Sequence, residues 1–122
     1  MACILLIDDD PAVRFLISDI LEECGYEVIT AASGTEGLQS LAKKQPDLVI
    51  TDIIMPDMNG IEVIMKLKIT NPKTKILALS AGGRITPERY LETAMEVGAQ
   101  KVLTKPIAHQ ELTKAVRELL ET

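Results

Sequence analysis

Five short apolar runs alternate along the chain with five longer segments in which apolar residues recur at helical spacing. The runs span residues 3–7, 27–31, 48–51, 75–79 and 101–103. Four of them are nearly unbroken in Ile, Leu and Val, which is typical of parallel strands covered on both faces. The run at 27–31, Glu-Val-Ile-Thr-Ala, is more polar and predicts an edge strand.

The segments between the runs predict amphipathic helices, because their apolar residues return every three or four positions. The clearest stripes comprise Val13, Leu16, Ile17, Ile20, Leu21 and Cys24 in the first segment and Leu112, Ala115, Val116, Leu119 and Leu120 in the last. The expected boundaries also carry the residues that helix caps require. These are Asp10 before Pro11, Ser33 with Glu36 three residues later, and Thr86 before Pro87 at the starts, and Gly25 and Gly98 at the ends.

Strict alternation of strand and helix over 122 residues predicts a single α/β domain, residues 1–122. Its fold class is a doubly wound, five-stranded parallel sheet with helices on both faces. Periodicity does not reveal the strand order. Ligands of such sheets bind beyond the carboxyl ends of the strands, so the residues that follow each run are the candidates for a site.

Polar side chains follow four of the runs. They are Asp8, Asp9 and Asp10 after the first, Asp52 after the third, Ser80 after the fourth and Lys105 after the fifth. Clustered carboxylates repel each other, by about 4 kcal/mol for two unit charges ~4 Å apart at an effective dielectric constant of 20, and therefore need a cation. Oxygen ligands with no His or Cys nearby favour Mg²⁺, or Mn²⁺, over zinc.

These residue types together suit phosphoryl transfer to an aspartate. A divalent ion neutralises the incoming phosphate oxygens and leaves a carboxylate free to attack phosphorus. We expect Lys105 to pair with Asp52 at rest and with the phosphoryl group afterwards. Ser80 is placed to donate a hydrogen bond to a phosphoryl oxygen.

Four stretches resemble the receiver domains of two-component response regulators, in the family's order and at comparable spacing. They are Ile7-Asp8-Asp9-Asp10-Pro11, Asp52-Ile53-Ile54-Met55-Pro56-Asp57-Met58-Asn59-Gly60, Ser80-Ala81 and Leu103-Thr104-Lys105-Pro106-Ile107. The resemblance covers essentially the whole chain, and the Asp-x-x-Met-Pro-x-Met-x-Gly stretch is its most specific part. It implies the flavodoxin-like strand order 2-1-3-4-5 of the chemotaxis member.

The resemblance makes Asp52 the phosphoacceptor. Asp9 and Asp52 would bind Mg²⁺, or Mn²⁺, with the main-chain carbonyl of Ile54, and Asp8 would act mainly through water. Asp57, in the same stretch, is interpreted as a turn former.

Two further residues take roles from the resemblance. Ser80 would be the switch hydroxyl that follows the phosphoryl group, and Lys105 would be the phosphate-binding lysine. The Lys105-Pro106 bond is expected to be cis, a minority form of the X-Pro bond.

The resemblance implies a phospho-accepting switch in a two-component phosphorelay. The single histidine, His109, lies at an expected helix start and is not expected to carry a phosphoryl group. The donor would therefore be a histidine kinase, a His-containing phosphotransfer protein or a small acyl phosphate. Phosphorylation would shift the surface of the fourth helix, fifth strand and fifth helix, and the signal would pass to a binding partner or a phosphorylation-dependent homodimer. Beyond self-phosphorylation from a phosphodonor and slow self-dephosphorylation, no enzymatic activity is expected.

Some positions depart from the family pattern. Val102 stands where many receivers carry Tyr or Phe, so the switch must be read out in another way. Ile54 and Gly82 flank the acceptor where polar groups are frequent. Because such groups help to orient an attacking water, we expect self-dephosphorylation to be slow. The glycine-containing stretch 81–86 predicts a mobile loop.

Other readings are weaker or stay open. A haloacid-dehalogenase-type phosphatase wants a second Asp two residues after its nucleophile, where Ile54 stands. A flavin carrier would need a phosphate-binding loop after the first strand and more aromatic residues than Phe15, Tyr26 and Tyr90. An unphosphorylated receiver-like docking module and the excised receiver of a longer DNA-binding or enzymatic regulator remain as alternatives.

The composition of the chain bears on whether it binds nucleic acid or a membrane. The net charge of −5 argues against direct nucleic-acid binding by this segment. No signal peptide is visible, and no run approaches the ~18 apolar residues that a membrane span needs. We therefore expect a cytoplasmic protein without membrane contact.

Overall fold

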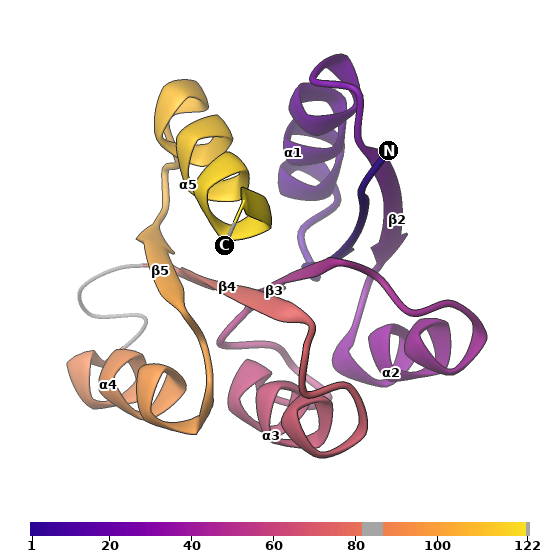
Figure 1. The fold of residues 1–122 in the computed structure, drawn as a ribbon. Helices are drawn as coiled ribbons and strands as arrows, with labels where there is room; N and C mark the ends of the chain where they lie inside the picture. The colour runs from indigo at the N-terminus through magenta and orange to yellow at the C-terminus, as the bar shows by residue number, and fades with distance from the viewer. Residues whose placement is uncertain (82–86, 122) are drawn as a thin grey trace.

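The computed structural model describes residues 1–81 and 87–121, which form five strands and five helices in strict alternation (Figure 1). The strands are β1 (Cys3–Ile7), β2 (Glu27–Ala31), β3 (Leu48–Asp52), β4 (Lys75–Ser80) and β5 (Lys101–Thr104). The helices are α1 (Pro11–Glu23), α2 (Gly34–Lys43), α3 (Gly60–Thr70), α4 (Glu88–Val97) and α5 (His109–Glu121).

The strands form one parallel sheet in the order β2-β1-β3-β4-β5, which confirms the expected fold class and strand order. Figure 1 shows α1 and α5 on one face of the sheet and α2, α3 and α4 on the other. The polar β2 lies at an edge, as its composition predicted. Three strands run one residue beyond the predicted runs, because Asp52 pairs with Leu79 and Ser80 with Thr104.

The core consists of two apolar layers, one on each face of the sheet. Successive side chains of a strand point to opposite faces, so Ile4 and Leu6 join the layer under α1 and α5, while Leu5 and Ile7 join the layer under the other helices. All five residues of β1 are buried. This two-sided burial explains why the strands are apolar without alternation.

The starts of α1 and α2 and the ends of α1 and α4 follow the predicted caps. Asp10 accepts a hydrogen bond from the Ala12 amide at the start of α1, and Ser33 accepts one from the Glu36 amide at the start of α2. Gly25 and Gly98 have φ angles of 93° and 143°. Both angles lie in the range that favours glycine.

Two expectations about helix faces were wrong. Leu16 and Cys24 were assigned to the buried stripe of the first helix, but Leu16 is 55% exposed and Cys24 is exposed. Leu16 directly precedes the buried Ile17, so one helical step of about 100° turns it away from the sheet. Cys24 is the C-cap residue, beyond the last turn of α1.

The start of α4 differs from the prediction at Pro87. The N-cap of this helix is Pro87 itself and Glu88 is its first residue, so the predicted proline-at-first-position pattern is displaced by one. The predicted cap Thr86, and most of the loop expected to be mobile, lie outside the described residues. None of the helices in the described ranges has the length and apolarity that crossing a membrane requires.

Candidate functional site

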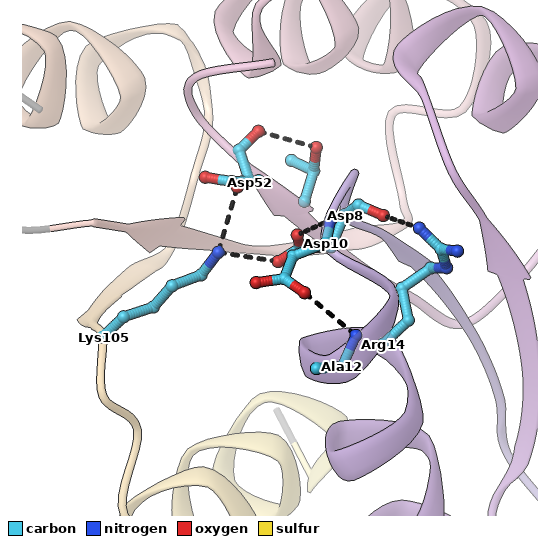
Figure 2. A network of polar contacts seen from close by, with 7 residues as sticks. Asp8, Asp10, Ala12, Arg14, Asp52 and Lys105 are labelled. Atoms are coloured by element: carbon cyan, nitrogen blue, oxygen red, sulfur yellow. Dashed lines mark hydrogen bonds and ion pairs between the residues drawn. The ribbon is translucent and has the colours of Figure 1, made fainter. Parts of the chain in front are cut away.

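The polar residues singled out in the sequence meet at the carboxyl end of the sheet. β1 delivers Asp8 and Asp9, β3 ends at Asp52, β4 ends at Ser80, and Lys105 follows β5. Figure 2 shows the side chains of Asp8, Asp52 and Lys105 converging over this edge. The parallel topology brings them together, because parallel strands end at the same side of a sheet.

Lys105 forms ion pairs with carboxylates from two strands (Figure 2). Its Nζ lies 2.8 Å from Asp8 Oδ2 and 3.0 Å from Asp52 Oδ2. The Asp8 side chain is fully buried, and the Lys105 side chain is only 20% exposed. The expected resting pair between Lys105 and Asp52 is therefore present, and Asp8 shares the ammonium.

Three carboxylates gather beside this ammonium. Asp8, Asp9 and Asp52 each offer a carboxylate oxygen, and these oxygens lie within 4.8 Å of one another. Asp52 Oδ1 is buried and has no hydrogen-bond partner among the described residues. A buried, unpartnered carboxylate oxygen is costly unless something neutralises it. The oxygen-only cluster therefore fits a hard divalent cation such as Mg²⁺.

Burial and the neighbouring charges shift the pKa values of Asp52 and Lys105. Burial raises the pKa of Asp52, the nearby Asp8 and Asp9 charges act in the same direction, and the Lys105 hydrogen bond opposes them without cancelling the effect. Burial alone would lower the pKa of Lys105, but its contacts with Asp8 and Asp52 raise it. Within residues 1–81 and 87–121, one ammonium faces three carboxylates, which leaves the site in need of positive charge.

The β1–α1 loop is fixed by contacts around Asp8 (Figure 2). The Asp10 amide donates to Asp8 Oδ1 at 2.9 Å, and Arg14 Nη1 donates to the Asp8 carbonyl at 2.6 Å. Sequence reasoning identified the cap Asp10 but missed Arg14, which lies one turn into α1 and carries no motif signal of its own. These bonds hold the loop that presents Asp9.

Ser80 and Lys105 are linked through the main chain. Ser80 is fully buried at the end of β4, and its carbonyl accepts a hydrogen bond from the Lys105 amide at 2.7 Å. The bond between Lys105 and Pro106 is cis, as expected. Gly82, named as a flanking position, lies outside the described residues.

The β3–α3 loop, residues 53–59, is held tightly behind Asp52. The Gly60 amide donates to the Ile53 carbonyl at 2.6 Å, and a Cβ on Gly60 would lie 2.2 Å from the Asp52 carbonyl oxygen. Only glycine permits this close approach. Ile54 is half-buried in the loop and packs against the core layer under α2, α3 and α4.

Residues 4–117 match the family model described as the response regulator receiver domain. The chain belongs to this family. Receiver domains are signalling modules of two-component systems, and the cluster of Asp8, Asp9 and Asp52 is compatible with the Mg²⁺ that they bind.

The chain is also similar to individual receivers. Sporulation initiation phosphotransferase F of Bacillus subtilis (strain 168) is 30% identical, over 96% of this chain and 92% of its own length. A CheY-like receiver domain protein from Methanospirillum hungatei JF-1 has a TM-score of 0.93 at 30% identity, covering 99% of this chain and 94% of that one. The response regulator TrrA from Thermotoga maritima, in complex with Mg²⁺-BeF, has a TM-score of 0.86 at 33% identity and covers 98% and 99%.

The relatives differ in length. The chain spans nearly all of the Bacillus phosphotransferase but only 26% to 50% of several other curated relatives, which are response and transcriptional regulators. Both short and long members of the family thus contain a unit of this kind.

Proposed function

We propose that this receiver is a phospho-accepting switch in a cytoplasmic two-component phosphorelay, with Asp52 as the acceptor. One observation supports this above all. Asp52 is 4% exposed, its Oδ1 has no hydrogen-bond partner among the described residues, and it lies between two other carboxylates and an ammonium. Such a carboxylate, kept next to an ammonium, suits nucleophilic attack on an electron-poor phosphorus.

The donor is a phosphohistidine of a histidine kinase or a phosphotransfer protein. A carboxylate oxygen of Asp52 attacks the phosphorus, a P–O bond forms, the P–N bond to the imidazole breaks, and the leaving imidazole takes up a proton. Asp9, Asp52 and the Ile54 carbonyl would hold Mg²⁺, or Mn²⁺, with Asp8 acting through water. When bound, the ion offsets the negative charge of the phosphoryl oxygens.

The same residues respond to the new group. Phosphorylation adds about −1.5 to −2 charges, so Lys105 transfers its ion pair from the Asp52 carboxylate to the phosphoryl oxygens. The hydroxyl of Ser80 donates to one of these oxygens. Ser80 ends β4, Lys105 follows the neighbouring β5, and the two share a main-chain hydrogen bond, so their rearrangements are coupled.

The readout surface is formed by α4, β5 and α5. Leu91, Met95 and Val102 line a shallow groove on it, and Lys101 pairs with Glu118 at 2.9 Å between β5 and α5. Val102 offers no aromatic ring that could swing inward, so the signal passes as a shift in a pre-existing equilibrium of this surface. Its partners are a phosphotransfer protein, a kinase or a second copy of the chain.

Two alternatives compete with this proposal, and the relatives support the first of them. The long regulators among the relatives favour the receiver of a larger DNA-binding or enzymatic protein, in which case the output would lie elsewhere. A docking module that is never phosphorylated is the second alternative. The net charge of −5 argues against direct nucleic-acid binding by this domain in either case.

The experiment is incubation of the domain with Mg²⁺ and acetyl phosphate, followed by intact mass measurement. We expect one phosphoryl adduct that hydroxylamine removes and that Asp52→Asn abolishes. Asp47→Asn is the matched control, because Asp47 is an acid at the opposite end of β3 that hydrogen-bonds the Cys3 amide. Absence of an adduct at saturating donor would favour the docking module.

A further inference from the structure

Asp57 links the β3–α3 loop to a distant helix. Its Oδ2 accepts hydrogen bonds from the Thr35 amide at 3.1 Å and the Thr35 hydroxyl at 2.8 Å, and its Oδ1 accepts one from the Gly34 amide at 3.3 Å. The partners are 22 and 23 residues away in the sequence. The sequence-based interpretation of Asp57 as a local turn former therefore missed its main contacts.

These bonds complete the amino-terminal cap of α2. The first amides of a helix have no partner within the helix, and here Ser33 satisfies only the Glu36 amide. Asp57 satisfies the two amides before it, and a carboxylate is favoured at this end by the helix dipole. Hydrogen bonds from Thr35 also lower the pKa of Asp57, so the carboxylate is charged at neutral pH.

The other end of the loop is fixed as well. The Ile53 amide donates to the Leu79 carbonyl at 3.0 Å, and the Ile53 carbonyl accepts from the Gly60 amide at 2.6 Å. Ile54 directly follows the fixed residue Ile53, and only two residues separate it from Asp57. The two anchors therefore lie on either side of Ile54 and restrict the path of the main chain there.

We propose that Asp57 is a positioning residue for the metal site. By clamping the β3–α3 loop to α2, it holds the Ile54 carbonyl toward the cation that Asp9 and Asp52 bind. The inference rests on the proposed function. Groups that orient metal ligands from outside the ligand set change metal affinity by about 10- to 100-fold when they are lost.

The test measures Mg²⁺ affinity directly, by titrating the ion and following backbone amide shifts in NMR spectra. We expect Asp57→Ala to weaken Mg²⁺ binding by about tenfold, at the low end of the range for such groups. Thr35→Ala should weaken it less, because it removes the hydroxyl contact but keeps both backbone contacts. Phosphorylation by acetyl phosphate should return toward the wild-type rate at saturating Mg²⁺.

Asp47→Ala is the matched control. Asp47 also bridges distant segments through a carboxylate, since it accepts the Cys3 amide at 2.8 Å, but it lies at the opposite end of β3. Its loss should lower the free energy of unfolding and leave Mg²⁺ affinity at the wild-type value. A purely structural role for Asp57 would make the two variants alike in both measurements.

The outcomes separate the two proposals. If the wild-type domain binds no Mg²⁺, the proposed function fails. If the wild type binds and Asp57→Ala binds equally tightly, while fast hydrogen exchange at the Gly34 and Thr35 amides shows the clamp to be open, this inference alone is overturned. Should Asp57→Ala not fold, Asp57→Asn, which keeps one acceptor oxygen, and Thr35→Ala provide the same comparison.

Discussion

The ammonium of Lys105 lies 3.0 Å from the Asp52 carboxylate, and the same nitrogen lies 2.8 Å from Asp8. One side chain that follows β5 thus joins two acids at the carboxyl ends of β1 and β3. In the part of the chain that the structure describes, this ammonium pairs with both buried carboxylates and offsets their negative charge. The resting site is therefore held together by an ion pair that phosphorylation must rearrange.

Lys105→Met should destabilise the metal-free domain. Removing one partner of a fully buried ion pair costs about 3–5 kcal/mol, and the 20% exposure of Lys105 reduces the expected loss to about 2 kcal/mol. Urea unfolding in EDTA measures it, and Mg²⁺ should restore part of the loss. Lys101→Met breaks the exposed pair with Glu118 and should cost much less than Lys105→Met, because water screens an exposed ion pair. Equal losses in the two variants would contradict the assigned role of Lys105.

Much of the fold could be predicted from the sequence, because strands buried on both faces are apolar along nearly their whole length. Asp52 and Ser80 could be placed at one edge since parallel strands share their direction. The strand order could not be predicted in this way, because periodicity carries no information about which strands are neighbours. It came from the family resemblance and the sheet confirms it.

The parts of the site that escaped prediction are held by contacts between a side chain and main-chain atoms, six residues apart for Arg14 and Asp8 and more than twenty for Asp57. Arg14 binds the Asp8 carbonyl, and Asp57 binds the amides of Gly34 and Thr35. A carbonyl or amide partner leaves no side-chain pattern, so nothing in a single sequence marks these pairs. The exposure of Leu16 was also not predictable, because the spacing of apolar residues does not show how wide the buried part of a helix face is.

Asp52→Asn should stabilise the metal-free domain at pH 7. Burial first, and then the neighbouring acids, raise the folded-state pKa of Asp52 above the ordinary value of 3.8. The folded state therefore holds its proton more tightly than the unfolded state, and stability is lost as the pH rises from 3.8 through the folded pKa. The gain from the substitution should shrink toward zero as the pH falls to that lower limit. Urea unfolding in EDTA between pH 3.5 and about 7 checks this, and a variant less stable than the wild type at pH 7 would contradict it.

Mg²⁺ should raise the thermal midpoint of the wild-type domain. A ligand that binds only the folded state stabilises it by about 2.7 kcal/mol at a concentration of 100 times its dissociation constant. Asp9→Asn removes an exposed carboxylate of the cluster and should reduce this response with little change in the metal-free midpoint. Asp19→Asn, an acid of α1 outside the cluster, is the control and should keep the full response. Differential scanning fluorimetry with and without Mg²⁺ measures both.

Gly60→Ala should damage the site as well as the fold. Its Cβ would lie 2.2 Å from the Asp52 carbonyl oxygen, so β3 or the start of α3 must move, at a cost of about 1–3 kcal/mol. Gly25→Ala is the comparison, since Gly25 has a φ of 93° and its Cβ would meet no atom within 4 Å. Both variants should unfold at lower urea concentration, but only Gly60→Ala should bind Mg²⁺ more weakly. Unchanged Mg²⁺ affinity in Gly60→Ala would show that the approach to Asp52 does not matter to the site.

Ile54→Asn should shorten the lifetime of the phosphoryl group. Ile54 is half-buried two residues after the acceptor, and its apolar side chain offers no hydrogen bond to an attacking water. An amide there can orient the water without acting as a base, so we expect roughly tenfold faster decay, well below the 10²–10⁴ of a full general base. The intact-mass adduct is followed after the donor is removed in excess Mg²⁺. Ile54→Val keeps the site apolar, so its phosphoryl group should decay at the wild-type rate. A phosphoryl lifetime of seconds in the wild type would contradict the expectation that Ile54 makes self-dephosphorylation slow.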